Sequence, residues 1–163
     1  MKKKAHGPRT IVSCLIFNDA GKLLLLQRHR LAGGGGYWAP PGGKVEEGES
    51  LRAAVTREVQ EETGLHVTNL DFAAAHEVII PSGVVHMQSF VAHLSVVQEI
   101  VLDPNEHEAY VWLSLPELLQ TERIIWGLPT ILHDTGFIEK LERDHSLEEG
   151  MTANFMTSLP VNV

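Results

Sequence analysis

Cysteine and positive charge are both scarce in this chain of 163 residues. The one cysteine, Cys14, excludes an internal disulfide. Because it lies in an apolar run with no motif around it, we expect a buried structural thiol rather than a nucleophile. The chain has 13 lysines and arginines against 21 aspartates and glutamates, a formal net charge of −8. This balance argues against a nucleic-acid polymer as partner, whereas a small anionic substrate is compatible if metal ions locally reverse the field.

Long apolar runs are also missing from the chain. No run approaches the length of a transmembrane span, and no apolar signal segment follows the basic start at residues 1–4. We therefore expect no membrane partner and a cytoplasmic location. The length predicts one domain with its own core, at residues 10–143, between an N-terminal arm (1–9) and a C-terminal tail (144–163). The tail lacks periodicity, which leaves two alternatives, a disordered end or a segment that serves a neighbouring subunit of a homodimer.

The first part of the chain has the pattern of a β-hairpin. Apolar, β-rich runs at residues 10–17 and 22–28 flank a turn at 18–21. Residues 23–26 are continuously apolar rather than alternating, which predicts a strand covered on both faces and a sheet with helices on each side. The glycines at 33–36 form either a lip near the substrate or a plain solvent loop, because two prolines follow where a dinucleotide-binding helix would begin.

The remaining segments predict further strands and short helices, so the chain has the pattern of an α/β fold. The expected strands are residues 65–80, as one long or interrupted strand, 84–97 and 109–113. The expected helices are residues 116–120 and 128–143, the second interrupted or begun near Pro129 and Gly136.

The strongest helix signal lies within residues 42–65. Ser50 is a candidate N-cap and Gly64 a candidate C′ residue, so we expect a helix at residues 51–63. One face of it follows the i, i+3, i+4 periodicity of a core-facing stripe. The members of this stripe are Leu51, Ala54, Val55, Glu58, Glu61 and Glu62. Its first half is apolar, and its second half is entirely acidic.

Acidic residues in these positions oppose the helix locally. Glu58 is spaced i,i+3 from Glu61 and i,i+4 from Glu62, and each like-charge pair costs roughly 0.2–0.5 kcal/mol. A bound divalent cation is the simplest way to offset this repulsion between carboxylates, and oxygen ligands favour Mg²⁺ or Mn²⁺ over zinc. Because Mg²⁺ usually shares its shell with water and substrate phosphates, the stripe predicts a phosphate-handling metal site. The alternative is a solvated acidic helix end.

The residues around this helix follow a longer pattern. Five residues separate Gly43 from Glu49, and seven more lead to Arg57 and Glu58. An apolar residue, two glutamates, a glycine and an apolar residue follow at fixed spacings. The stretch resembles the Nudix box with every defined position filled, and the resemblance extends more loosely over residues 10–112. It implies a three-layer α/β/α sandwich with a mixed central sheet, and a hydrolase that uses divalent metal to cleave a nucleoside diphosphate linked to another group.

The resemblance also implies roles for individual residues. The implied metal site consists of Glu58 and Glu62 as main ligands, with Gly43 and Glu61. Glu61 would be a further ligand or a general base. Arg57 would orient the carboxylates, and Glu49 would pair with Arg57, support the metal shell or contact substrate. The implied cofactor is Mg²⁺, with Mn²⁺ as an alternative.

A polar loop at residues 103–108 precedes the expected strand at 109–113. In Nudix enzymes a glutamate from this region sometimes activates the attacking water. The resemblance therefore makes Glu106 and Glu108 candidate bases beside Glu61. The alternative for both residues is ordinary surface charge.

Several other residues are candidates for contact with substrate. The substrate-binding candidates are Arg28, Trp38, Glu49 and Trp126. Trp38 and Trp126 could each contact a nucleobase, or each could anchor the packing of its segment. His76 or His86 could touch substrate or face solvent, and none of the nine histidines has the close pairing of a zinc site.

The resemblance implies a nucleotide substrate but leaves the class of nucleotide open. The short chain resembles the MutT-like nucleoside triphosphate pyrophosphatases, which we rank first. Pro81 is placed as in members that cleave ADP-ribose, so ADP-ribose or a nucleotide sugar is the second hypothesis. A third hypothesis is a sensor module that binds a nucleotide without cleaving it, although the box is intact.

Overall fold

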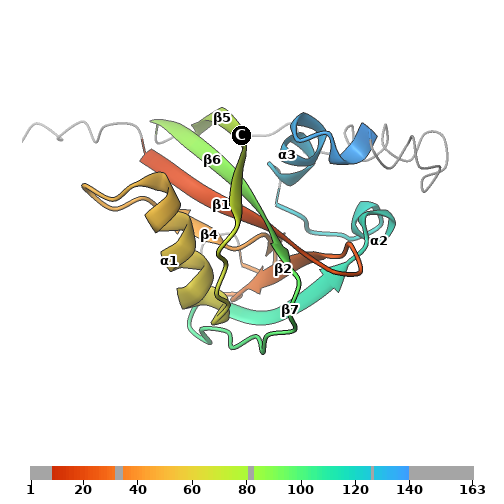
Figure 1. The fold of residues 1–163 in the computed structure, drawn as a ribbon. Helices are drawn as coiled ribbons and strands as arrows, with labels where there is room; N and C mark the ends of the chain where they lie inside the picture. Colours follow the sequence, from red (N-terminus) through yellow and green to blue (C-terminus); the bar gives the residue numbers. More distant parts are fainter. Residues whose placement is uncertain (1–8, 32–34, 81–82, 126, 140–163) are drawn as a thin grey trace, which may run out of the picture.

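The computed structural model describes residues 9–31, 35–80, 83–125 and 127–139. The strands are β1 (Arg9–Asn18), β2 (Leu23–Arg28), β3 (Trp38–Ala39), β4 (Gly42–Lys44), β5 (Leu70–Ile80), β6 (Gly83–Leu94) and β7 (His107–Leu113). The helices are α1 (Leu51–Thr63), α2 (Leu115–Leu119) and α3 (Leu128–Asp134) (Figure 1). Within these residues, no helix combines the length and apolar character needed to cross a membrane.

The strands form one mixed sheet that branches at β1. The main order is β3-β2-β1-β6-β5, with β4 paired to β1 and β7 paired to β2. Strand β1 runs parallel to β6 along its whole length, and the other pairs are antiparallel. On its other edge, β1 pairs with β4 at residues 11–13 and with β2 at Phe17. The predicted mixed sheet is therefore confirmed.

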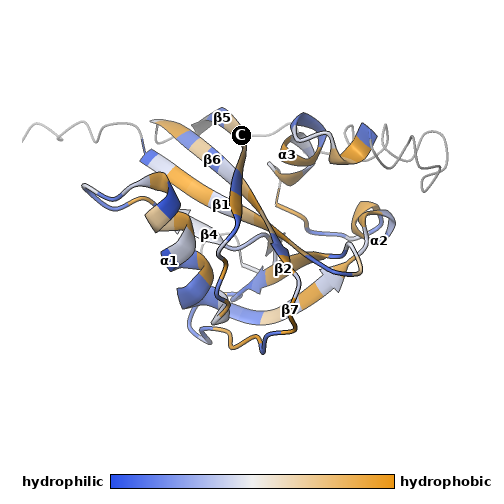
Figure 2. Cartoon of the chain, in the orientation of Figure 1, coloured by the Kyte–Doolittle hydropathy of each residue, from blue (hydrophilic) through white to orange (hydrophobic). Residues whose placement is uncertain are grey.

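Helices cover both faces of this sheet, as predicted. The face toward α1 packs a core that includes Val12, Leu24 and Leu26, with Val55 and Val59 from the helix. The opposite face packs a second core under α2 and α3, formed by Leu15, Leu23, Leu25, Leu118, Leu128 and Leu132. Side chains of β2 thus alternate between the two cores, which explains its unbroken apolar run. Figure 2 shows the apolar colour of β1 between the helical layers.

The caps of α1 are those expected from the sequence. The Ser50 hydroxyl accepts a hydrogen bond from the Ala53 amide at 3.2 Å. Gly64 has a φ of 70° and donates its amide to the carbonyl of Gln60. Because a left-handed residue at the end of a helix favours glycine, both boundaries of the predicted helix are confirmed.

The boundaries of β5 and β6 differ from the expected ones. Strand β5 begins at Leu70, so the prediction was wrong for residues 65–69. There the His66 amide donates to Gln98 Oε1 at 2.9 Å, and Gln98 Nε2 donates to the His66 carbonyl at 3.2 Å. The side-chain amide of Gln98 thus makes with His66 the backbone hydrogen bonds that a neighbouring strand would otherwise make. Strand β6 ends at Leu94 rather than at residue 97.

The last described third of the chain needs two further corrections. Strand β7 begins at His107, so Glu108 belongs to a strand and not to the expected loop. Helix α2 starts one residue early, at Leu115, with Ser114 as its N-cap. Helix α3 ends at Asp134, a turn at Gly136 (φ 73°) follows, and residues 137–139 are helical again. The predicted interruption is thus confirmed, while residues 140–143 and the tail lie outside the described residues.

Cys14 is fully buried in the core beneath α1, which confirms the structural thiol. Burial raises the pKa of this thiol to about 12. Because the thiolate is the reactive form, we expect native protein to resist a thiol reagent at about pH 8. Protein unfolded in guanidinium should release one equivalent of thiol in a colorimetric thiol assay. Rapid labelling of the folded protein would contradict this burial.

Candidate active site

Arg57 lies at the centre of a group of four charged residues, here called the Arg57 cluster (Arg57, Glu49, Glu58 and Glu61). Arg57 Nε donates to Glu49 Oε1 at 3.0 Å, and Nη2 donates to Glu49 Oε2 at 3.0 Å. Nη1 donates to Glu58 Oε1 at 2.9 Å and to Glu61 Oε2 at 3.1 Å. Nη2 also donates to the backbone carbonyl of Lys44 at 3.0 Å. One guanidinium therefore ties the box helix to β4 and to the preceding loop.

These bonds set the electrostatics of the cluster. Hydrogen bonds from Arg57 hold the pKa of Glu49 below its usual range. The same bonds raise the pKa of Arg57, so it stays charged. Both oxygens of Glu49 face Arg57, which places this residue in the cluster rather than among the residues that line the pocket described next.

A pocket of about 700 Å³ connects the C-terminal half of α1 with the α3 side of the sheet. Its polar end is lined by Arg28, Gly42, Gly43, Glu58, Glu62 and Glu106. Its other wall is apolar and is lined by Val85, Met87, Ile125, Leu128 and Ile131. The pocket thus offers charge at one end and an apolar surface at the other.

Glu58 lies directly against Gly43 at the polar end. A β-carbon on Gly43 would overlap the Glu58 carboxylate, so any larger residue there must displace this carboxylate. Burial raises the pKa of Glu58, and the hydrogen bond from Arg57 opposes this shift. Glu58 is the member of the Arg57 cluster that also reaches the pocket.

Glu62 is the most deeply buried carboxylate of the site. Its side chain is 6% exposed, and its Oε2 accepts a hydrogen bond from the Gly42 amide at 2.8 Å. Burial raises the pKa of Glu62 to about 8, and the charges of Glu58 and Glu106 add to the rise. A carboxylate with so little water and so much negative charge beside it is ionised at neutral pH only if a cation compensates it.

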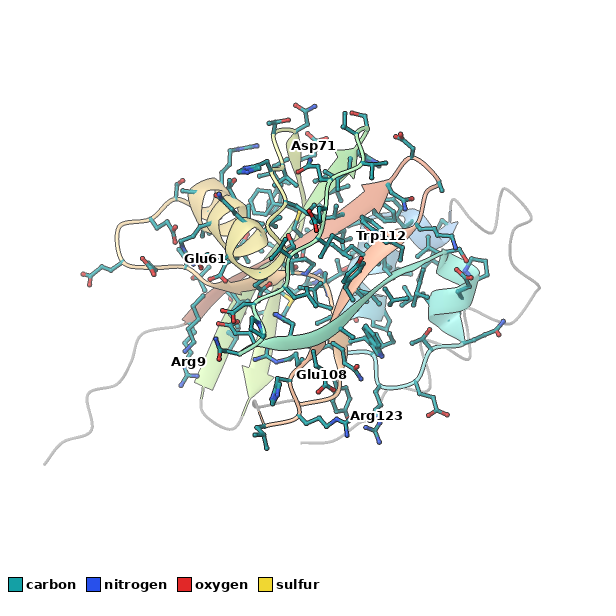
Figure 3. All side chains as sticks on the ribbon, turned by 90° about the horizontal axis from the view of Figure 1, so that it is seen from below. Arg9, Glu61, Asp71, Glu108, Trp112 and Arg123 are labelled. Atoms are coloured by element: carbon teal, nitrogen blue, oxygen red, sulfur yellow. The ribbon has the colours of Figure 1, made fainter. Side chains whose placement is uncertain are left out.

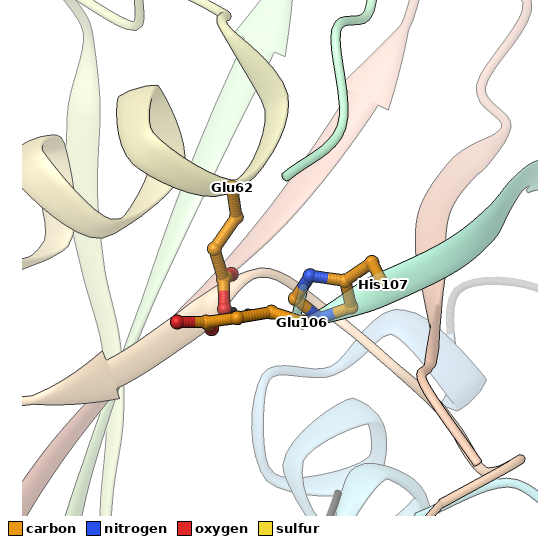
Figure 4. A group of neighbouring side chains, drawn as sticks. All are labelled: Glu62, Glu106 and His107. Atoms are coloured by element: carbon orange, nitrogen blue, oxygen red, sulfur yellow. Dashed lines mark ion pairs between the residues drawn. The ribbon is translucent and has the colours of Figure 1, made fainter. Parts of the chain in front are cut away.

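Glu62 also forms a second group with Glu106, in the turn before β7, and with His107, the first residue of β7. Ligand atoms of Glu62, Glu106 and His107 all lie within 4.8 Å of one another. Figure 4 shows Glu62 reaching from the end of α1 toward Glu106 and His107. Burial lowers the pKa of His107, and the charge of Arg28 contributes to this shift, which favours the neutral imidazole.

Arg28 and Lys44 bring positive charge to the lining of the pocket. Arg28 lies beside the carboxylates, because its charge affects the pKa of Glu62 and of His107. The residue ends β2 beside a register shift in its pairing with β7. The Nε of Arg28 is buried and has no hydrogen-bond partner among the described residues. An unpaired guanidinium nitrogen in a pocket is a natural contact for an anionic oxygen.

Other residues singled out from the sequence lie outside the pocket lining. Glu61 is 60% exposed on α1, and Glu108 on β7 pairs with Arg30 at 3.2 Å, well apart from Glu61 (Figure 3). Trp38 packs on the α3-side core. His76 and His86 pair with Asp134 and Glu77, respectively. Trp126, Pro81 and the glycines at 33 and 34 lie outside the described residues.

The polar end of the pocket fits a divalent metal ion. Its donors are carboxylate oxygens of Glu58, Glu62 and Glu106, the ligand type that Mg²⁺ and Mn²⁺ prefer. Burial raises the pKa of Glu62, and a cation beside it would offset this shift and favour the ionised carboxylate. Glycine at position 43 leaves the space that the Glu58 carboxylate occupies.

Gly43→Ala tests this arrangement, because the added methyl group must displace the Glu58 carboxylate. We expect metal affinity to fall about 10-fold, as it does when a residue that orients a metal ligand is removed. Isothermal titration with Mn²⁺ measures this change. Gly127→Ala, where the new methyl would only touch Met87 at 3.9 Å, is a control that should leave metal affinity unaltered. Equal affinities for both variants would contradict the role of Gly43.

Sequence reasoning missed His107 and the apolar wall of the pocket. His107 is adjacent to Glu106, a candidate base, and this adjacency was the available signal. The apolar wall gave no signal, since Met87 and Leu128 look like ordinary core residues of a strand and a helix. Their place in a pocket depends on how α3 packs against β6.

Comparison with known proteins agrees with this geometry. The family model of the NUDIX domain matches residues 7–134. The CTP pyrophosphohydrolase of Escherichia coli (strain K12) is 36% identical over 110 residues, which cover 68% of this chain and 78% of that protein. A putative 8-oxo-dGTP diphosphatase 2 of Mycobacterium tuberculosis is 34% identical over 124 residues, 74% of this chain and 79% of that protein.

A solved structure supports the same assignment. The crystal structure of a MutT protein from Methanosarcina mazei Go1 is similar with a TM-score of 0.69 and 32% identity. The match covers 90% of this chain and 99% of that chain. Together with the intact box, these similarities show that the chain belongs to the NUDIX domain family and is a hydrolase that acts on phosphoric anhydrides.

Proposed function

We propose that this protein is a Mg²⁺-dependent nucleoside triphosphate pyrophosphohydrolase, with Mn²⁺ as an alternative metal. The observation that carries the proposal is the buried Glu62 carboxylate, which opens with Glu58 and Glu106 into a pocket whose far wall is apolar. A nucleotide has the matching form, since its phosphates are anionic and its base is flat and largely apolar. We place the catalytic domain at residues 10–143.

In the proposed mechanism Glu58 and Glu62 hold the metal, and the Arg57 cluster fixes Glu58. The bound metal would neutralise phosphate charge and lower the pKa of the attacking water. Arg28 binds a phosphate oxygen through its unpaired Nε. Glu106 takes the proton as water attacks phosphorus and the pyrophosphate leaves. Of the three candidate bases, Glu106 is favoured because it lines the pocket, whereas Glu61 and Glu108 do not.

The apolar wall is proposed to bind the nucleobase. Met87 from β6 and Leu128 and Ile131 from α3 face the pocket from the side opposite Glu58. Relatives named for CTP and 8-oxo-dGTP favour a nucleoside triphosphate as substrate. ADP-ribose and nucleotide sugars remain the second hypothesis. A non-catalytic sensor is disfavoured because the carboxylates, Arg57 and Gly43 are all in place.

A panel assay tests this function. Full-length protein with Mg²⁺ is incubated with CTP, 8-oxo-dGTP, the common nucleoside triphosphates, ADP-ribose and a nucleotide sugar. We expect a nucleoside triphosphate to give a nucleoside monophosphate and pyrophosphate. Hydrolysis in ¹⁸O-labelled water, followed by mass spectrometry, then shows which phosphorus is attacked. Preferred cleavage of ADP-ribose would overturn the substrate class, and tight nucleotide binding without turnover under any divalent metal would establish the sensor.

A further inference from the structure

His107 has an unusual environment for a buried histidine. Its side chain is 5% exposed, at the first position of β7. Among the described residues neither ring nitrogen makes a hydrogen bond, and Nδ1 is buried without any partner. His76 and His86 differ from it in that each has a carboxylate oxygen within 3.4 Å of Nδ1, although His76 Nε2 is likewise buried without a hydrogen-bond partner among the described residues. A buried ring nitrogen without a hydrogen bond costs free energy. A ligand at Nε2 would supply a partner for that nitrogen, while Nδ1 stays without one among the described residues.

The ring faces Glu62 Oε1, which accepts no hydrogen bond among the described residues. His107 Nε2 lies 3.8 Å from Glu62 Oε1, while Oε2 of the same carboxylate is held by the Gly42 amide. Two ligand atoms on one ion, each at about 2.1 Å, can be at most about 4.2 Å apart. The separation of 3.8 Å is therefore too long for a hydrogen bond but compatible with one shared ion.

Glu106 completes the group from the next residue along the chain. The ligand atoms of all three residues lie within 4.8 Å of one another. Glu106 is exposed, so a rotation of its side chain can bring its oxygen closer to a bound ion. Figure 4 shows the three side chains converging from α1, from the turn before β7 and from the first residue of β7.

We propose that His107 is a nitrogen ligand to a second metal ion held with Glu62 and Glu106. In the Mg²⁺ form, which lacks this second ion, Glu106 stays free to act as the base. This inference rests on the proposed function, since it concerns the same site. An imidazole ligand suits Mn²⁺, Co²⁺ and Zn²⁺ better than Mg²⁺, which prefers oxygen. The site would then accept a transition metal at this position in addition to the carboxylate-bound ion of the catalytic reaction.

Pulsed electron paramagnetic resonance of the Mn²⁺-loaded protein tests the proposal without relying on activity. The sample is full-length protein without an affinity tag, prepared once with natural and once with ¹⁵N-labelled histidine. We expect nitrogen modulation of the Mn²⁺ signal that changes with the isotope. His107→Gln should abolish this modulation, whereas His76→Gln, which alters a histidine outside the group, should keep it.

Metal selectivity provides a second measurement. The ratio of Zn²⁺ to Mg²⁺ affinity should fall by on the order of 10-fold or more in His107→Gln, measured by competition titration. Absence of nitrogen modulation in the wild-type protein overturns the proposal, and so does modulation that persists in a folded His107→Gln protein. If His107→Gln does not fold, the isotope effect in the wild-type protein and its loss in His107→Asn decide the matter.

The parallel panel assay separates this proposal from the proposed function. Turnover with Mg²⁺ but no nitrogen modulation overturns the His107 assignment alone. Nitrogen modulation without turnover of any panel compound supports the metal ligand and overturns the pyrophosphohydrolase.

Discussion

Glu62→Gln is expected to lower kcat by about 1000-fold while the protein stays folded, because the amide cannot supply the charge that holds the metal. The substitution keeps the size of the side chain and an oxygen that can accept the hydrogen bond of the Gly42 amide. Steady-state kinetics with a nucleoside triphosphate and Mg²⁺ measure the loss. Glu47→Gln, in the exposed loop before α1, is the matched control and should retain wild-type turnover.

The same variant separates a metal-binding role from a structural one. Burial raises the pKa of Glu62 from 4.5 to about 8, so the metal-free folded state holds a proton that the unfolded state releases. Stability is therefore lost as the pH rises from about 4.5 to 8. Glutamine carries no such cost. We expect metal-free Glu62→Gln to melt at or above the wild-type temperature at about pH 8, with a smaller gap at about pH 5.

Added Mg²⁺ should reverse this order. A ligand that binds only the folded state raises its melting temperature, so the wild-type protein should gain more from metal than the variant. Scanning calorimetry with and without Mg²⁺ measures both effects. Near-normal turnover of Glu62→Gln at ordinary Mg²⁺, or equal metal-induced shifts in the two proteins, would remove Glu62 from the metal site.

Arg57→Ala is expected to lower kcat by about 100-fold, because it frees Glu58 from the position that faces the pocket. A displacement of a catalytic group by about 1 Å can have this effect. Arg57 does not line the pocket, so KM should change less than kcat. Arg57→Lys should recover little activity, since an ammonium cannot reproduce the paired bonds to Glu49.

Arg52→Ala is the matched control for Arg57→Ala. Arg52 lies on the same helix, and its guanidinium donates to the Leu70 carbonyl at 2.7 Å, outside the Arg57 cluster. Its loss should leave kcat close to the wild-type value. A double-mutant cycle adds a second check, because Glu49→Gln should cost less activity in the Arg57→Ala background than alone. Similar kinetics for the two arginine variants would show that Arg57 has no positioning role.

The sequence by itself determined the box helix and the layers around it. Ser50 and Gly64 set the ends of α1 through hydrogen bonds to residues within about one turn. The apolar run at residues 23–26 predicted a strand buried on both faces. Both signals are local in the chain, so periodicity and cap chemistry suffice to read them. The spacing of residues from Gly43 to Glu62 likewise indicates the family without knowledge of the fold.

Only the tertiary structure decided which of the three α1 carboxylates face the pocket and which is exposed. The stripe on α1 grouped Glu58, Glu61 and Glu62, but the fold directs Glu58 and Glu62 into the pocket and leaves Glu61 exposed beside Arg57. Helical periodicity predicts the direction of a side chain around the helix only to within a broad arc. The close approach of Gly43 on β4 to the Glu58 carboxylate fixes this side chain at the pocket, which periodicity alone does not do.

The contribution of β7 was decided in the same way. His107 and Glu106 meet Glu62 across 44 or more residues of chain because β7 pairs with β2 in one register, with a shift at Arg28. A register offset by one residue would turn each side chain to the opposite face. Sequence patterns report on neighbours along the chain, and the meeting of α1 with β7 depends on the pairing of strands that are distant in the sequence.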